Sequence, residues 1–194
     1  MRIIAGTKKG MNLFGPKSMV SRPITDRVKE SLFSVLYKYD MPEGAVVADL
    51  FSGVGSMGLE SLSRGAKFVT FVDKDWGIVK ILRQNIDKAG FVQQSQVIKA
   101  SAFNVELDIA PEGEKCDLVF VDPPYIKSKN AESGSPLADL LISLGDKISS
   151  QGIVVVRTSD EVVIADTYGR LQVVERRTWG TMNVCFLRGA ALDQ

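Results

Sequence analysis

The sequence predicts an α/β protein built around one mostly parallel β-sheet. Three observations lead to this prediction. Short, nearly continuous apolar segments alternate with helical segments over most of the chain, a glycine-rich turn follows the first apolar segment, and only WGT separates the flanks of the last two strand-like segments. Strands that are apolar throughout are typical of a parallel sheet covered by helices on both faces. The last two segments are too close in sequence for a crossover, so they predict an antiparallel hairpin.

The first part of the chain predicts a small hairpin followed by one helix. RIIAG and GMNLF flank a turn rich in Gly, Thr and Lys, which favours a β-hairpin over residues 2–14. After a loop, Thr25 or Asp26 is suited to cap a helix. One side of that helix is apolar at Val28, Leu32, Val35 and Leu36.

From residue 45 onward, strands and helices alternate. Strands are expected at 45–50, 68–72, 96–99, 118–121 and 153–157, and the hairpin strands at 171–176 and 183–187. Helices are expected at 58–65, 78–88 and 137–147, and a flexible loop at 126–136. We therefore expect two parts, a basic N-terminal hairpin extension at 1–24 and one α/β domain at 25–194.

Composition narrows the possible functions. The chain is 45% hydrophobic and 24% charged, as expected for an ordinary globular protein. It has no apolar segment near the ~20 residues that span a bilayer, and its N-terminus lacks the apolar core of a signal peptide, so we expect a cytoplasmic protein. Cys116 and Cys185 lie in strand-like segments and are expected to be reduced core thiols. The absence of histidine excludes histidine-based acid–base catalysis and most zinc sites.

Charge is distributed unevenly along the chain. Residues 1–38 hold eight Lys or Arg against two carboxylates, a net charge of +6, so the rest carries −5 within a total of +1. A basic end on an acidic body indicates a surface that faces a polyanion. From charge alone, a solvated basic tail is an equally good interpretation.

A glycine-rich motif follows the first strand. In DLFSGVGSMG, Gly53, Gly55 and Gly58 fit G-x-G-x-x-G, a pattern that lets a nucleotide approach the backbone between a strand and a helix. Asp73 ends the next strand, where a carboxylate can bind two ribose hydroxyls. These features do not separate a nicotinamide dinucleotide from S-adenosylmethionine, and a turn needed only for packing is the structural alternative.

A second motif, VFVDPPY at residues 119–125, distinguishes these cofactors. Proline fixes φ and restricts the residue before it, so Asp122-Pro123-Pro124 is stiff. It offers only acceptors, the carboxylate and the backbone carbonyls, while Tyr125 offers a flat face to a base. Such a set suits an exocyclic amine that gains positive charge during methyl transfer. Hydride transfer has no need of it, although a turn that merely ends the strand also fits.

Taken together, DLFSGVGSMGLE, FVDKD and VDPPY resemble class I S-adenosylmethionine-dependent methyltransferases that methylate amino groups. RPITDRVKESLF at residues 22–33, with RIIAG at the start, resembles the RsmD family of 16S rRNA guanine-N2 methyltransferases. The resemblance covers nearly the whole chain. It implies a Rossmann-like sheet, S-adenosylmethionine as cofactor, and methyl transfer to the N2 amine of a guanine in 16S rRNA of the small ribosomal subunit.

The resemblance also implies roles for individual residues. The cofactor would be bound by Asp49, Phe51, Ser52, Gly53, Gly55, Asp73, Ser101 and Ala102. Of these, Asp49 would lie near the amino group, Asp73 at the ribose and Ser101 beside the adenine. The catalytic set that holds the guanine would be Asp122, Pro123, Pro124 and Tyr125. Many methyltransferases have an acidic residue or Asn at the position of Ser101, and family members often have Thr at that of Ile24.

Binding of the substrate is assigned to the basic N-terminal part and to the loop after DPPY. The residues are Arg2, Lys8, Lys9, Arg22, Thr25, Arg27, Lys127 and Lys129. The expected partner is 16S rRNA or a small-subunit particle, bound by a monomer without a metal or a membrane. We also expect the N-terminal segment to serve RNA binding and not folding.

Three other functions remain open at this point. The first is an amino-methyltransferase that acts on DNA adenine or protein glutamine, since related motifs occur in both. The second is an NAD(P)-dependent Rossmann oxidoreductase. The third is an RNA-binding module that keeps the fold without catalysis.

Overall fold

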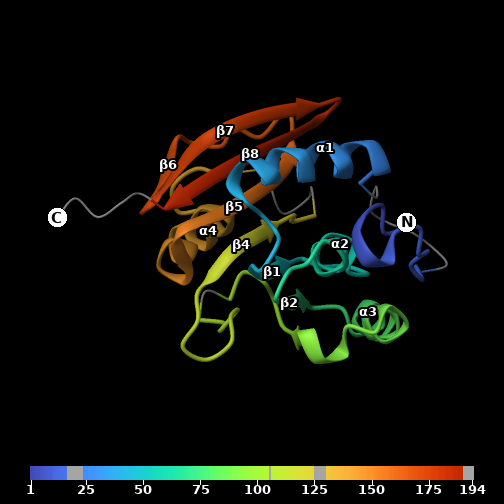
Figure 1. Cartoon of the computed structure of the whole chain (residues 1–194). Helices are drawn as coiled ribbons and strands as arrows, with labels where there is room; N and C mark the ends of the chain where they lie inside the picture. The colour runs from blue at the N-terminus through green and yellow to red at the C-terminus, as the bar shows by residue number, and fades with distance from the viewer. Residues whose placement is uncertain (17–23, 105, 125–129, 190–194) are drawn as a thin grey trace.

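The computed structural model describes residues 1–16, 24–104, 106–124 and 130–189. These form one eight-stranded sheet in the order β3-β2-β1-β4-β5-β8-β7-β6 (Figure 1). The strands are β1 (Val46–Leu50), β2 (Phe68–Asp73), β3 (Ser95–Lys99), β4 (Cys116–Val121), β5 (Ile148–Ser159), β6 (Thr167–Tyr168), β7 (Leu171–Trp179) and β8 (Met182–Gly189). The α-helices are α1 (Asp26–Leu36), α2 (Ser56–Ser63), α3 (Trp76–Ala89) and α4 (Pro136–Lys147).

The parallel half of the sheet has the strand order of a fold that binds ligands at one edge. β1 pairs in parallel with β2 on one side and with β4 on the other, so the strand order reverses between β1 and β4. Leu50 is in register with both Val72 and Val121, which brings the ends of the three strands together. Ligands of open α/β sheets bind at such a reversal, beyond the carboxyl ends of the strands.

The other half of the sheet is antiparallel, as the short WGT connection predicted. β8 pairs antiparallel with both β5 and β7, and β6 pairs with β7 at the far edge. Sequence analysis missed β6 because it has only two residues. It also placed the start of β5 too late, since this strand begins at Ile148, directly after α4.

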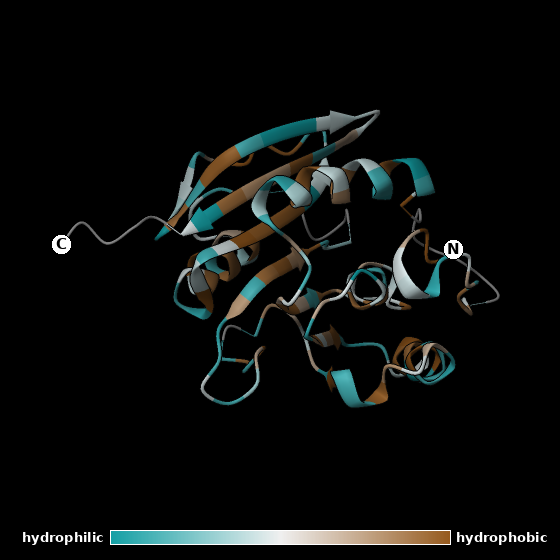
Figure 2. Cartoon of the chain, in the orientation of Figure 1, coloured by the Kyte–Doolittle hydropathy of each residue, from teal (hydrophilic) through white to brown (hydrophobic). Residues whose placement is uncertain are grey.

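Helices cover both faces of the sheet, as predicted. On one face, α1, α2 and α3 pack through residues such as Phe33, Leu59 and Leu82 against Phe71 and the other side chains of that face. On the opposite face, α4 packs against alternate residues of the same strands. Figure 2 shows hydrophobic residues along the central strands and hydrophilic stretches along β7, in agreement with a strand whose outward side chains are mostly exposed.

Three of the helices begin at a side-chain cap. The hydroxyl oxygen of Thr25 accepts a hydrogen bond from the backbone N–H of Val28, as the sequence predicted for α1. Asp75 caps α3, and Ser135 caps α4, in which Pro136 occupies the first turn. These caps satisfy N–H groups that a helix leaves unpaired at its start. Because Ser56 follows a glycine, α2 begins without such a cap.

The N-terminal segment forms a reduced hairpin that belongs to the core. Only Arg2 and Asn12 form a β-bridge, and a short 3-10 helix (Gly6–Lys8) makes the turn. Ile3 and Leu13 are buried in the same apolar cluster as α1, α2 and α3. This packing argues against the expectation that the segment is unnecessary for folding.

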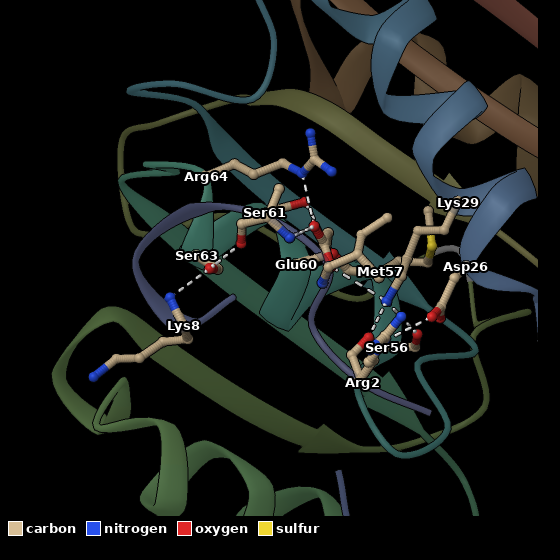
Figure 3. A network of polar contacts seen from close by, with 12 residues as sticks. Arg2, Lys8, Asp26, Lys29, Ser56, Met57, Glu60, Ser61, Ser63 and Arg64 are labelled. Carbon is tan, nitrogen blue, oxygen red and sulfur yellow. Dashed lines mark hydrogen bonds and ion pairs between the residues drawn. The ribbon is translucent and has the colours of Figure 1, made fainter. Parts of the chain in front are cut away.

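A buried carboxylate on α2 ties this segment to the helices (Figure 3). Glu60, which is 0% exposed, accepts hydrogen bonds from the backbone N–H groups of Ile4 (2.8 Å) and Ala5 (3.0 Å). It also pairs with Lys29 of α1, at 3.2 Å, and with Arg64, at 2.8 Å. One side chain therefore holds together the N-terminal segment, α1 and the end of α2.

The lysine in this cluster is as deeply buried as the carboxylate. Lys29 is 1% exposed, and its ammonium donates to the carbonyl oxygen of Arg2 (2.7 Å) and to the hydroxyl of Ser56 (3.3 Å). Burial lowers the pKa of Lys29, while the charge of Glu60 opposes that change. Within the RPITDRVKESLF motif, Lys29 thus has a structural role at the start of α2.

Two bulk features of the sequence can also be compared with the structure. Cys116 and Cys185 are buried free thiols, as expected, and burial raises the pKa of Cys116 to about 12. Among the described residues, none of the helices combines the length and the apolar character that crossing a membrane requires.

Replacing Glu60 by Gln should destabilise the protein strongly. The change keeps the size of the side chain but leaves the buried charges of Lys29 and Arg64 without a counter-charge. Removing one partner of a buried ion pair costs about 3–5 kcal/mol of unfolding free energy. Urea denaturation measures the loss of unfolding free energy. Glu30→Gln, on the exposed side of α1, is the control and should change stability by less than about 0.5 kcal/mol. A loss below about 1 kcal/mol for Glu60→Gln would contradict the role of this cluster.

Candidate functional site

Charged side chains gather where the parallel strands end. Asp49 is the second-last residue of β1, Asp73 ends β2, and Asp122 follows β4 directly. Arg157 joins them from β5, because Val156 is in register with Val121 and places the next residue of each strand side by side. The structure thus brings together the three carboxylates that the sequence predicted, at the point where the strand order reverses.

The loop between β1 and α2 is held tightly against β2. The backbone N–H groups of Phe51 and Ser52 both donate to the carbonyl oxygen of Val72, each at 3.0 Å. Phe51 has a φ of 72°, a left-handed conformation that is unfavourable for a residue with a side chain. Such backbone strain persists only where surrounding contacts enforce it, and it clusters at functional sites. The ring of Phe51 meets that of Phe103 edge-on at 5.0 Å, which links the loop to the segment after β3.

The three glycines of the motif have different roles. A Cβ at Gly58 would lie 2.3 Å from the ring of Phe71, so this glycine lets α2 pack closely on β2. Gly55 has a φ of 91°, and a Cβ there would lie 2.6 Å from Leu82. Gly53 also has positive φ, at 55°, but a Cβ there would meet nothing within 4 Å. The backbone at Gly53 is therefore the part of the motif that a ligand can approach.

Asp49 is the most deeply buried carboxyl group of the site. It is 2% exposed, and its Oδ2 accepts a hydrogen bond from the backbone N–H of Gly58 at 2.9 Å. Burial, together with the charges of Asp122 and Asp73, raises the pKa of Asp49 to about 7, although Gly58 and Arg157 act in the opposite direction. A carboxyl group in this state is suited to a cationic partner, which would favour its ionised form.

Asp73 is fixed by two backbone donors. Its Oδ2 accepts from the N–H of Gly53 at 3.0 Å, and its Oδ1 accepts from the N–H of Asp75 at 2.9 Å. An ionised carboxylate has about four acceptor positions, so both oxygens can still accept hydrogen bonds from hydroxyl groups. The fixed geometry next to Gly53 agrees with a ribose-binding role.

Asp122 is paired with an arginine that sequence analysis did not identify as a site residue. The Nε of Arg157 donates to Oδ1 at 2.6 Å, and its Nη2 contacts Oδ2, so the pair is bidentate. Burial raises the pKa of Asp122, while the adjacent Arg157 opposes that change. The only signal in the sequence was an arginine at the end of IVVVR, whose neighbour in the sheet could not be known.

The other predicted residues near this edge are partly described. Pro123 is buried and Pro124 exposed, whereas Tyr125 lies outside the described residues. Ser101 is exposed, and its hydroxyl accepts from the backbone N–H of Phe103 at 3.3 Å, while Ala102 is buried. Ser101 and Ala102 therefore adjoin Phe103, which contacts the glycine loop.

The predicted substrate-binding residues do not form one group. Arg2 is exposed and pairs with Asp26 at 2.7 Å, close to the start of α2, where Lys29 binds both Arg2 and Ser56. In contrast, the backbone N–H of Lys8 donates to Ser63, the last residue of α2. Arg2 and Lys8 therefore lie at opposite ends of this helix.

The remaining members of that set vary in how they are placed. Lys9 and Arg27 are exposed, and so is Thr25, whose hydroxyl caps α1. The ammonium of Lys8 lies 5.7 Å from the centre of the Phe91 ring. Arg22, Lys127 and Lys129 fall outside the described residues.

Comparison with known proteins identifies the family. The model of the family described as Conserved hypothetical protein 95 matches residues 1–188. The chain belongs to this family. It is the RsmD family that the motifs indicated, and members appear among the curated relatives.

Two of these relatives illustrate the extent of the similarity. YlbH of Bacillus subtilis is 30% identical over 191 residues, which cover 97% of this chain and 98% of that protein. The ribosomal RNA small subunit methyltransferase D of Escherichia coli is 36% identical over 141 residues, which cover 72% of this chain and 67% of the relative.

Solved structures confirm the Rossmann-like fold that was expected. The yhhF methyltransferase structure from Escherichia coli has a TM-score of 0.78 at 24% identity, and the match covers 98% of each chain. The rRNA methyltransferase aviRa from Streptomyces viridochromogenes has a TM-score of 0.66 at 16% identity, covering 88% of each chain. At such low identity these two structures bear on the fold alone.

Replacing Asp49 by Asn should stabilise the RsmD-family fold of this chain above neutral pH. The pKa of Asp49 in the folded protein, about 7, lies above the ordinary value of 3.8, so this group contributes stability at low pH that is lost as pH rises to about 7. Asn keeps an acceptor for Gly58 and removes the ionisation. Because one pKa unit corresponds to about 1.4 kcal/mol, the gain at pH 8 should be up to about 4 kcal/mol, and close to zero at pH 4.

Urea denaturation of the ligand-free protein at pH 4 and pH 8 measures this difference. Asp87→Asn, at an exposed position of α3, is the control and should shift stability by a small amount that hardly depends on pH. Destabilisation by Asp49→Asn at pH 8 would show that the ionised carboxylate is compensated within the fold.

Proposed function

We propose that this chain transfers a methyl group from S-adenosylmethionine to the exocyclic N2 amine of a guanine in 16S rRNA of the small ribosomal subunit. The observation that carries the proposal is the position of Asp122-Pro123-Pro124. This acceptor segment leaves β4 beside the glycine loop of β1, where the strand order reverses. The family and the name of the Escherichia coli relative support small-subunit rRNA as the substrate.

The residues present fit the proposed cofactor. Asp49 is a buried carboxyl group whose raised pKa would suit a nearby ammonium group, and Asp73, which two backbone N–H groups hold in place, would accept hydrogen bonds from two ribose hydroxyls. Gly53 leaves its backbone open to a ligand, while Ser101 and Ala102 would lie beside the adenine. Phe51, Ser52 and Gly55 would complete the set. When bound, S-adenosylmethionine would supply an electrophilic methyl group.

The acceptors of DPPY would act on the amine of the base. Pro123 and Pro124 have no N–H, so Asp122 and the carbonyl oxygen of Pro123 face the amine as acceptors only. Binding its hydrogens would draw the nitrogen lone pair out of the ring and stabilise the positive charge that develops on nitrogen. Asp122 could then take up the proton that the methylated amine loses, because burial already raises its pKa. Stacking of the base on Tyr125 remains a prediction.

The basic N-terminal part would hold the RNA. Arg2, Thr25 and Arg27 lie around the start of α1. This region is close to Ser56, the first residue of α2, which directly follows the glycine loop. Contacts to phosphates would position the RNA without reading its sequence. The shape of folded rRNA would then supply much of the specificity.

Replacing Asp73 by Ala should weaken the binding of S-adenosylmethionine. The change removes the acceptor of the ribose hydroxyls, and a hydrogen bond to a charged group contributes about 1.5–3 kcal/mol. Isothermal titration calorimetry measures the dissociation constant, with Asp87→Asn on α3 as a control of unchanged affinity. An unaltered dissociation constant for Asp73→Ala would remove this residue from the site.

Replacing Asp122 by Asn should lower turnover far more than cofactor affinity. Asn preserves the shape of the segment but removes the charge that stabilises the developing cation. We expect a loss on the order of 10²-fold in single-turnover methylation of small-subunit particles. Asp146→Asn, an exposed change at the end of α4, should keep the wild-type rate. A rate for Asp122→Asn near that of the wild type would leave DPPY as a structural turn.

The same assay distinguishes the alternative substrates. Radioactive methyl transfer is measured with small-subunit particles, free 16S rRNA, duplex DNA and a protein that carries an exposed glutamine. Digestion of the labelled RNA to nucleosides should yield N2-methylguanosine. Label in DNA or protein and none in rRNA would contradict the proposal, as would binding of NAD(P)H without a response to S-adenosylmethionine.

A further inference from the structure

Arg157 makes the closest charged contact of the site and takes no part in the function described so far. Its guanidinium meets both oxygens of Asp122 in a bidentate arrangement. Such pairs are the strongest and most directional of charge-assisted hydrogen bonds. The pair of Arg157 and Asp122 also depends on the sheet itself, because the parallel register of β4 and β5 places these two residues next to each other.

The arginine approaches Asp122 from the side of the antiparallel half of the sheet. Its side chain is 14% exposed, and its Nη1 lies 4.0 Å from the sulfur of Met182, the first residue of β8. Asp122 is 27% exposed. Two of the roughly four acceptor positions of the carboxylate are used by Arg157, so two remain for another donor.

Ionisation of Asp122 is opposed by its other surroundings. Burial favours its neutral form, and the charge of Asp122 in turn raises the pKa of Asp49 of β1. Asp73 of β2 adds a third carboxylate, which acts on Asp49. Arg157 of β5 is the cation that favours the ionised form of both Asp122 and Asp49, while Met182 of β8 has no charge.

We propose that Arg157 is a positioning residue for methyl transfer, which keeps the Asp122 carboxylate ionised and orients its unused acceptor positions toward the amine of the target base. This inference rests on the proposed function of Asp122. It adds a residue outside all the motifs that carried the resemblance. Arg157 acts through Asp122 and need not touch the base.

The test is the pH dependence of single-turnover methylation at saturating S-adenosylmethionine. Without Arg157, Asp122 would be protonated over a wider range of pH. The single-turnover rate of Arg157→Gln should therefore be lower than that of the wild type by about tenfold or more at pH 6, and by no more than about threefold at pH 9. Arg157→Lys keeps the charge without the bidentate geometry, so its rate should lie between those of the wild type and Arg157→Gln. A purely structural role would lower the rate by the same factor at every pH.

A second variant assigns the effect to Asp122. In Asp122→Asn the group at this position no longer titrates, so adding Arg157→Gln should leave the remaining rate and its pH profile unchanged. Loss of Arg157 could also act on Asp49. Such an effect would change the affinity for S-adenosylmethionine and not the rate at saturation, so calorimetric dissociation constants at pH 6 and pH 9 distinguish it from the effect on Asp122.

The outcomes separate this inference from the proposed function. No methylation of rRNA by the wild type would overturn the proposed function. Methylation by the wild type, with an unchanged pH profile or a faster rate at every pH for Arg157→Gln, would overturn the role of Arg157 alone. Melting temperatures report whether Arg157→Gln folds. If Arg157→Gln does not fold, the pH profile of Arg157→Lys decides. A profile equal to that of the wild type, or a loss by the same factor at every pH, would contradict the inference.

Discussion

The carboxylate of Glu60 is the interaction on which the arrangement of the N-terminal half depends. A fully buried charge is tolerated only when it is paired and its hydrogen-bonding capacity is used. Glu60 meets this condition with two backbone N–H groups of the N-terminal segment, Lys29 and Arg64. Since Lys29 also binds Ser56, the first residue of α2, the cluster sets where that helix begins. The glycine loop ends there, so this cluster supports the end of the loop that forms the proposed cofactor site.

The charges at the carboxyl edge show the opposite balance. Glu60 is matched by two cations, whereas of Asp49, Asp73 and Asp122 only Asp122 forms an ion pair within the described residues, with Arg157. Burial, together with the charges of Asp122 and Asp73, raises the pKa of Asp49 to about 7. A fold gains no stability from such an arrangement, and sites of this kind are typical of function. The same imbalance favours a ligand with positive charge, as S-adenosylmethionine has.

Much of the fold could be predicted because its signals are local. The apolar segments gave β1 and β2 within one residue, and Thr25 gave the cap of α1. The acceptor set of DPPY follows from the chemistry of proline, with no knowledge of its neighbours. Arg157 could not be found in this way, because its contact with Asp122 depends on strand order and register. The burial of Lys29 could not be predicted either, because a charged residue on a helix is normally exposed. Its partner Glu60 lies on another helix and is not apparent from the sequence.

The structure also changes what the basic N-terminus can contribute to RNA binding. Lys29 is used inside the core, Arg2 pairs with Asp26, and Lys38 pairs with Glu175. Each phosphate contact steepens the decrease of the logarithm of the binding constant with the logarithm of salt concentration by about 0.7–0.9. Cations that are already paired contribute less, so the net charge of the segment overstates its electrostatic contribution. In the proposed function, specificity would then depend more on the shape of the folded rRNA and on the base that Asp122 would hold.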